Sequence, residues 1–102
     1  MEIVTITYDS GLPAEAVDAL FRERAGKYRE MDGLLQKFYT VDEERGRVGG
    51  VYVFETAAAR DALFDSDVHA SLREAYDARD VEIDSAHVLF PLHEAAEFPA
   101  SS

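Results

Sequence analysis

His87 and His69 are the side chains best suited to acid–base chemistry at neutral pH, because the unperturbed pKa of histidine is about 6.5. We expect His87 in the middle of the last strand, on the face that carries Ile83 and Leu89. There it is either a catalytic acid or base, or a histidine of the core or of a subunit interface that makes one hydrogen bond. The strand pattern alone leaves both roles open.

His69 begins a helical segment in which Arg73 and Tyr76 follow one and two turns later. Residues at this spacing share one face of a helix. The group is therefore either a ligand-contacting cluster at the mouth of a cleft, with His69 as a catalytic residue and Arg73 as a ligand contact, or a solvated helix end.

Three tyrosines come from three different strands, and together they could form a ring of phenols around one pocket: Tyr8, Tyr39 and Tyr52. Tyr8 and Tyr39 are candidate ligand contacts, and Tyr52 is a candidate catalytic residue. The alternative is core packing with each hydroxyl at the rim. Lys37 lies within an apolar strand, where a charge is costly unless it is paired or reaches water. It would contact a ligand or form a salt bridge with a carboxylate of a partner chain.

The sequence does not predict a metal site. It contains no cysteine, which excludes disulfides and thiolate ligands. His87 and His93 are separated by Pro91, which interrupts a strand, so we do not expect them to share a face. The acidic turns lack the spacing of a calcium-binding loop.

Four strands and two helical regions must position these side chains. Apolar period, turn residues and capping residues predict a strand at Ile3–Tyr8, a helix from Pro13 to Met31, a hairpin at Gly33–Glu55, a helix from the N-cap Thr56 to Phe64, a break at Asp65–Asp67, a helical segment from Val68 to Tyr76, and a last strand at Val81–Leu92.

The order β-α-β-β-α-β predicts an α+β domain of the ferredoxin-like kind, a four-stranded antiparallel sheet with both helices on one face. We expect one domain over residues 1–93 and a loose tail at 94–102. Both hairpin strands carry apolar residues on both faces, so both sheet faces should be covered. The chain's own helices cover one, and we expect a second copy of the sheet, in a homodimer, to cover the other. Gly49 and Gly50, which open the second hairpin strand, predict a close backbone approach or a bulge.

The charge balance restricts the partners. The chain has 102 residues, with 21 acidic and 10 basic side chains and a net charge of −11. This surface repels nucleic acid and anionic membranes, so neither is an expected partner. The acidity provides solubility, or it marks adaptation to a high-salt cytoplasm. No apolar run is long enough to span a bilayer and no secretion signal opens the chain, so we expect a cytoplasmic protein.

Several segments resemble the YdhR-type monooxygenases of the dimeric α/β-barrel superfamily, which also includes antibiotic-biosynthesis monooxygenase-like proteins. The resemblance covers nearly the whole chain, and its most specific part is the glycine pair followed by an aromatic strand. The residues that carry it are Asp32-Gly33-Leu34, Lys37, Thr40 and Gly49-Gly50-Val51-Tyr52-Val53-Phe54 before an alanine-rich helix. It implies a homodimer with facing sheets and a cleft between each sheet and its helices. It also implies that a histidine on the second helix, here His69, is functional.

The resemblance implies a monooxygenase-like protein without a bound cofactor, acting on a small apolar or aromatic metabolite between sheet and helices. In such a site Lys37 or an arginine would hold the substrate anion, and a tyrosine or histidine would move the proton. The best-understood relatives use a tryptophan and an asparagine, and this sequence contains neither. Their absence favours the alternatives, which are a non-catalytic dimer that binds a small molecule such as haem and a purely structural dimer.

Overall fold

The computed structural model describes residues 1–93, so the tail predicted at 94–102 lies outside the described residues. The element order is the predicted one, with the second helical region divided into three short helices. The elements are β1 (Glu2–Ser10), α1 (Ala14–Arg29), β2 (Leu34–Asp42), β3 (Arg47–Phe54), α2 (Ala57–Phe64), α3 (Asp67–Ala70), α4 (Leu72–Tyr76) and β4 (Ala78–His87).

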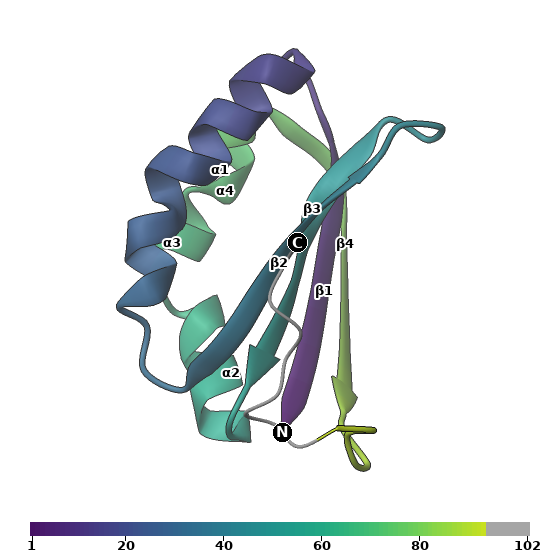
Figure 1. The fold of residues 1–102 in the computed structure, drawn as a ribbon. Helices are drawn as coiled ribbons and strands as arrows, with labels where there is room; N and C mark the ends of the chain where they lie inside the picture. Colours follow the sequence, from purple (N-terminus) through teal and green to yellow (C-terminus); the bar gives the residue numbers. More distant parts are fainter. Residues whose placement is uncertain (94–102) are drawn as a thin grey trace.

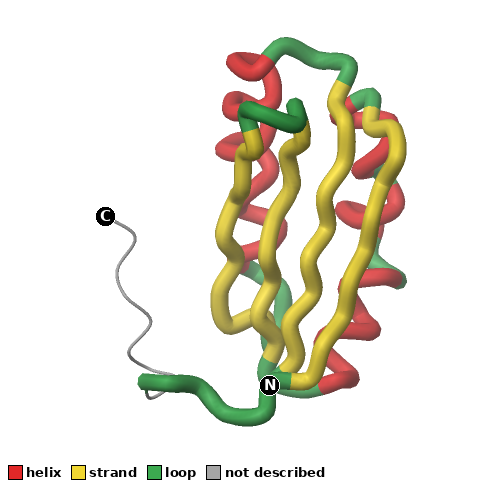
Figure 2. Tube along the Cα trace, turned by 90° about the vertical axis from the view of Figure 1, so that its right-hand side faces the viewer, coloured by secondary structure: helices red, strands yellow, loops and turns green. Residues whose placement is uncertain are grey.

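The strands form one antiparallel sheet in the order β2-β3-β1-β4. All the helices lie on one face of this sheet, as Figure 1 shows from the side. Figure 2 looks at the other face, where the four strands lie in front of the helices and no helix of residues 1–93 covers them. The predicted ferredoxin-like α+β fold is therefore confirmed.

The core fills the space between the sheet and the helices. Alternate residues of β1 point toward the helices: Val4, Ile6 and Tyr8 are at most 2% exposed, whereas the residues between them are only partly buried. Opposite them, α1 contributes Val17 and Phe21. The short helices contribute apolar side chains to the same core, namely Leu63, Val68, Leu72 and Tyr76.

Capping explains why the second helical region is divided. The hydroxyl of Thr56 accepts a hydrogen bond from the backbone N–H of Ala59, which confirms the predicted N-cap of α2. Ser66 accepts one from the N–H of His69 and begins α3. The Asp65–Asp67 segment thus ends one helix and starts the next.

The last strand differs from its predicted bounds. It runs from Ala78 to His87 instead of from Val81 to Leu92, and Leu89 and Leu92 are exposed. The reason is the length of β1, the strand with which it pairs: His87 lies opposite Glu2, where β1 begins, so a longer β4 would have no strand to pair with. His87 therefore ends the strand, and the prediction that it lies mid-strand with Leu89 on its face was wrong.

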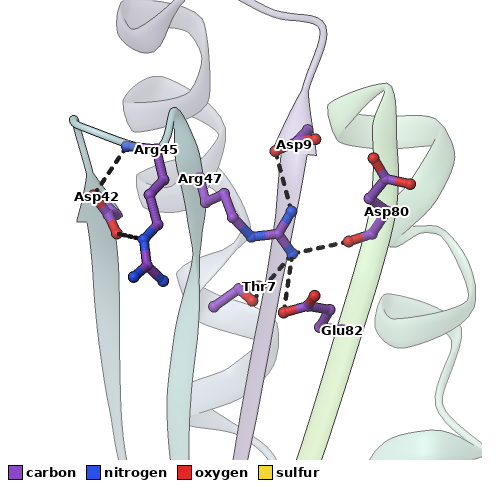
Figure 3. Close-up of polar contacts among 7 residues, drawn as sticks. All are labelled: Thr7, Asp9, Asp42, Arg45, Arg47, Asp80 and Glu82. Carbon is purple, nitrogen blue, oxygen red and sulfur yellow. Dashed lines mark hydrogen bonds and ion pairs between the residues drawn. The ribbon is translucent and has the colours of Figure 1, made fainter.

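Arg47 joins three strands at the end of the sheet near the β2–β3 turn. Its guanidinium contacts Oδ1 of Asp9 at 3.1 Å, Oγ1 of Thr7 at 3.2 Å and the carbonyl oxygen of Asp80 at 2.8 Å. Oε2 of Glu82 lies 3.6 Å away. Figure 3 shows these contacts, with Arg45 turned away to pair with Asp42. The guanidinium of Arg47 is therefore bound by residues of β1 and β4 within the sheet.

Residues 1–93 contain neither a membrane-spanning helix nor a cluster of metal ligands. Across residues 1–93, no helix is long and apolar enough to cross a membrane. Over the same residues, no three His, Asp or Glu side chains are grouped so that they could hold a metal ion.

Candidate functional site

A cavity of about 360 Å³ lies between α1 and the edge strand β2. Tyr28 and Arg29 line it from α1, while Lys37 and Tyr39 line it from β2; the remaining lining residues are Ala25, Leu34, Leu35 and Gln36. A second cavity of about 320 Å³ adjoins it, since Ala25, Arg29 and Tyr39 line both. A volume of this size is in the range that holds small organic ligands.

The amine of Lys37 is enclosed by three tyrosine rings. Its Nζ lies 3.4 Å from the ring centre of Tyr28, 4.2 Å from that of Tyr39 and 4.6 Å from that of Tyr52. We call Lys37 with these three rings the lysine cage. Among residues 1–93 no carboxylate pairs with this amine. The salt bridge predicted with a carboxylate of a partner chain stays a prediction.

Lys37 faces the helices because of an irregularity in β2. The pairing of β2 with β3 shifts by one residue between Leu34 and Gln36, and from there Lys37 lies opposite Tyr52. The side-chain oxygen of Gln36 accepts a hydrogen bond from the backbone N–H of Lys37 and so caps this bulge. A one-residue shift moves every following side chain to the opposite face. The bulge therefore places Lys37 and Tyr39 on the helix side.

Gly50 makes room for the lysine stem. A Cβ atom built at Gly50 would lie 3.1 Å from Cε of Lys37 and 3.0 Å from the carbonyl oxygen of Phe38. A larger residue would push the stem away from the sheet. One glycine of the predicted pair thus shapes the cage.

Burial lowers the pKa of Lys37 to about 7, and the positive charge of Arg24 lowers it further in the same direction. The ring faces attract an ammonium ion and oppose this shift, but they bind a cation less strongly than the water they replace. A substantial fraction of the Lys37 side chains is therefore a neutral amine at neutral pH.

Arg24 is fixed beside the cage by contacts with the short helices. Its guanidinium donates to the carbonyl oxygen of Val68 at 2.8 Å and to Oγ of Ser71 at 3.1 Å, and it lies 5.4 Å from the ring centre of Tyr76. Since no described carboxylate neutralises it, its charge acts on Lys37.

The predicted tyrosines are only partly brought together. Tyr39 and Tyr52 belong to the lysine cage, whereas Tyr8 packs on Tyr76 with ring centres 5.6 Å apart. Burial raises the pKa of the Tyr8, Tyr39 and Tyr52 hydroxyls above the ordinary range, and it raises the pKa of Tyr76 to about 12. These phenols stay protonated at neutral pH, so they can donate hydrogen bonds but do not act as anions.

His87 lies outside the cage, with β1 and β3 between its strand and β2. Its Nδ1 is 2.5 Å from Oε2 of the buried Glu2, whose other oxygen accepts from Arg60 at 2.9 Å. The hydrogen bond from His87 lowers the pKa of Glu2. The exposed imidazole is thus oriented by a carboxylate at the sheet end, a contact that the sequence pattern did not indicate.

His69 and Arg73 line another cavity, of about 150 Å³, between the short helices and β4. The His69 ring packs edge-on against Phe64 at 5.1 Å, and burial lowers its pKa. The cavity is lined by both predicted residues, but it is separate from the lysine cage.

Sequence reasoning missed Tyr28 and Arg24 as site residues. Both lie on the inner face of α1, one turn apart, and that spacing is equally typical of core packing. The signal that could have found them is the combination of Arg24 on a buried helix face with a lysine in an apolar strand, since two cations without carboxylates rarely lie inside a core.

The family model described as "Putative mono-oxygenase ydhR" matches residues 3–97. Comparison with curated proteins finds no significant match.

Several solved structures share the fold. A putative antibiotic biosynthesis monooxygenase from Deinococcus radiodurans is 16% identical, with a TM-score of 0.73 over 91% of this chain and 97% of that one. The protein NE2512 of unknown function from Nitrosomonas europaea is 16% identical, with a TM-score of 0.71 over 98% and 95%. A mutant of SnoaB, described as a cofactor-independent oxygenase from Streptomyces nogalater, is 14% identical, with a TM-score of 0.68 over 91% and 98%. At these identities the likeness is one of fold.

Proposed function

Since the chain belongs to the "Putative mono-oxygenase ydhR" family, we propose that it is a monooxygenase that oxidises a small apolar or aromatic metabolite without a bound cofactor, in the cavity between α1 and β2. The lysine cage is the observation that carries the proposal. It combines an amine of lowered pKa with aromatic walls at a cavity of ligand size. SnoaB, which shares the fold, is described as a cofactor-independent oxygenase, and this supports chemistry without a cofactor.

The chemistry starts with a proton transfer. The neutral Nζ of Lys37 takes an acidic proton from an electron-rich aromatic substrate, and the resulting ammonium ion pairs with the substrate anion. The anion transfers electrons to dioxygen directly. In the net reaction a CH₂ group and O₂ give a carbonyl group and water, so the substrate supplies all four electrons. Tyr28 and Tyr39 wall the cavity, and burial keeps the Tyr39 hydroxyl protonated by raising its pKa.

The other predicted site residues take no part in this step. His87 lies on β4, the edge strand opposite β2, and His69 and Arg73 line a separate cavity. Their catalytic or ligand-binding roles stay predictions.

Removing the amine should remove the activity. With an anthrone as the probe, we expect oxygen uptake by the wild type and a loss of about 100-fold or more in Lys37→Met, because a general base typically contributes 10²–10⁴-fold. Lys27→Met is the matched control, since Lys27 is exposed on α1 and should leave the rate unchanged. An oxygen electrode measures the rates, with uncatalysed autoxidation subtracted.

The same probe separates the enzyme from a binding protein. A rise in Tm with the anthrone, but oxygen uptake equal to autoxidation, would support the non-catalytic dimer. Uptake that survives in Lys37→Met would remove Lys37 from the reaction.

Haem does not fit the cavity beside His69. This cavity has a volume of about 150 Å³, below the range for drug-sized ligands. The imidazole ring of His69 is packed on Phe64. No step of the proposed reaction uses haem.

The open sheet face supports the proposed homodimer. It carries exposed or partly buried apolar residues from the β2–β3 side, including Phe38 and Val51, which lie opposite each other in the pairing. A second copy of the same face would cover this surface, as sheets pack face to face about 10 Å apart.

A charge at the centre of this face should separate the dimer. We expect Val51→Glu to raise the dimer dissociation constant by about 100-fold or more, because two copies would bury two unpaired carboxylates. Val41→Glu is the control, since Val41 is 63% exposed and lies on the helix side beside the turn. Sedimentation equilibrium measures both. A monomeric wild type at micromolar concentration would refute the dimer.

A further inference from the structure

We propose that Lys37 is a covalent capture site for small aldehydes and ketones, which enter the cavity between α1 and β2 and react with the caged amine to form an imine. The proposal goes beyond the oxidation described above. It requires only the amine and the cavity, and oxygen takes no part in it.

The cage leaves the amine accessible and without an ion-pair partner among residues 1–93. A buried structural lysine normally has a carboxylate or carbonyl partner, whereas the contacts of this Nζ are with ring faces, whose centres lie 3.4, 4.2 and 4.6 Å away. Lys37 also lines the 360 Å³ cavity, so a small molecule can approach the amine.

The electrostatic surroundings raise the fraction of the amine that is in its neutral, reactive form. A lysine that is desolvated or that lies beside another cation is activated as a nucleophile toward carbonyl carbon. Both conditions hold here, since burial and Arg24 each lower the pKa of Lys37. The titratable and charged groups around the amine come from three elements: Arg24, Tyr28 and Arg29 from α1, Tyr39 from β2 and Tyr52 from β3. None of them is a carboxylate.

The reaction balances without an oxidant or a reductant. The lone pair of Nζ forms a bond to the carbonyl carbon, and the electrons of the C=O π bond move to oxygen, which takes up a proton. The carbinolamine then loses its hydroxyl group and the remaining N–H proton as water, which leaves a C=N bond. Tyrosine hydroxyls at the cavity can donate hydrogen bonds to the carbonyl oxygen while it gains charge.

The chain offers an internal comparison, because Lys27 and Lys37 are its only lysines. The full chain is treated at pH 7 with benzaldehyde and sodium cyanoborohydride under nitrogen, and benzylation is followed by peptide mapping with mass spectrometry. An exposed lysine with a pKa of about 10.4 is neutral in only about one copy in 2,500 at this pH. We therefore expect Lys37 to be benzylated at least about tenfold faster than Lys27, even with the lower nucleophilicity of a less basic amine.

Variants and pH test the assignment further. The Lys27→Arg variant should keep the fast labelling of Lys37. The Lys37→Arg variant should lose it and keep only the slow labelling of Lys27 and the labelling of the N-terminal amine. The rate at Lys37 should level off above about pH 8 and fall below about pH 7. Equal rates at the two lysines, or labelling confined to Met1, would overturn the proposal. The comparison within the wild-type chain decides this even if Lys37→Arg does not fold. Because oxygen is excluded, the outcome is independent of whether the oxidation occurs.

Discussion

Replacing Lys37 with methionine is expected to stabilise the protein at pH 7, by about 2–4 kcal/mol of unfolding free energy. Folding lowers the pKa of Lys37 from about 10.5 to about 7. A shift of this size corresponds to roughly 4 kcal/mol at pH 7, since each pKa unit is about 1.36 kcal/mol. The lost contacts between the amine and the three rings reduce the gain. Methionine has a similar length and fits an apolar gap.

The sign of the effect follows from proton binding. Between pH 7 and 10.5 the unfolded chain holds the Lys37 proton and the folded chain has released it, so stability rises with pH in this window. Below about pH 7 both states are protonated and the full cost of burying the charge remains. The difference between Lys37→Met and the wild type should therefore be largest at or below pH 7 and shrink steadily toward pH 10.

Urea unfolding at pH 7, 8 and 9 measures this difference. The tyrosines titrate in both proteins, so their contribution cancels. Lys27→Met should change the unfolding free energy by less than about 0.5 kcal/mol, as expected for an exposed position. A Lys37→Met protein that is less stable than the wild type at pH 7 would show that the lysine is structural. A stability gain with a loss of activity would show that the site is maintained at the cost of stability.

Gly49→Ala is expected to destabilise the protein by about 3 kcal/mol or more, because overpacking of this kind moves backbone. A Cβ atom at Gly49 would overlap the carbonyl oxygen of Ile6 and lie 2.9 Å from Cα of Thr7. These atoms belong to β1, the strand that pairs with β3, so relief requires the two central strands to separate. No flexible side chain can move aside instead.

Gly26→Ala is the matched control with the opposite sign. Nothing lies within 4 Å of a Cβ atom built at Gly26, which is inside α1. Alanine should therefore stabilise the protein by about 1 kcal/mol through helix propensity. Thermal unfolding of the two variants should shift Tm in opposite directions. A Gly49→Ala protein with the Tm of the wild type would mean that β1 and β3 do not approach as closely as described.

The close approach at Gly49 shows what a local pattern can predict. Two glycines opening an aromatic strand predicted a close backbone approach or a bulge, and Gly49 is the close approach. The N-cap Thr56 and the break at Asp65–Asp67 were also predictable, because hydroxyl caps act on backbone groups three residues away. The end of β4 was not predictable in this way, since it depends on where β1 begins.

The candidate site could be predicted only in part. Lys37, Tyr39 and Tyr52 were recognised as candidates from their residue types, and the structure places all three in the lysine cage. Tyr28 was not recognised, because a helical period does not distinguish a residue that packs from one that encloses a ligand. His87 was recognised as an acid–base residue, but its carboxylate partner Glu2 is 85 residues away.

The sequence by itself determined the order of the elements, the antiparallel sheet and the excess of apolar surface on the hairpin, because these follow from residue period and turn chemistry. Only the tertiary structure decided which face of the sheet carries Lys37. The bulge between Leu34 and Gln36 adds one residue to β2, and because side chains alternate along a strand, this single residue turns Lys37 from the open face toward Tyr28 and the helices.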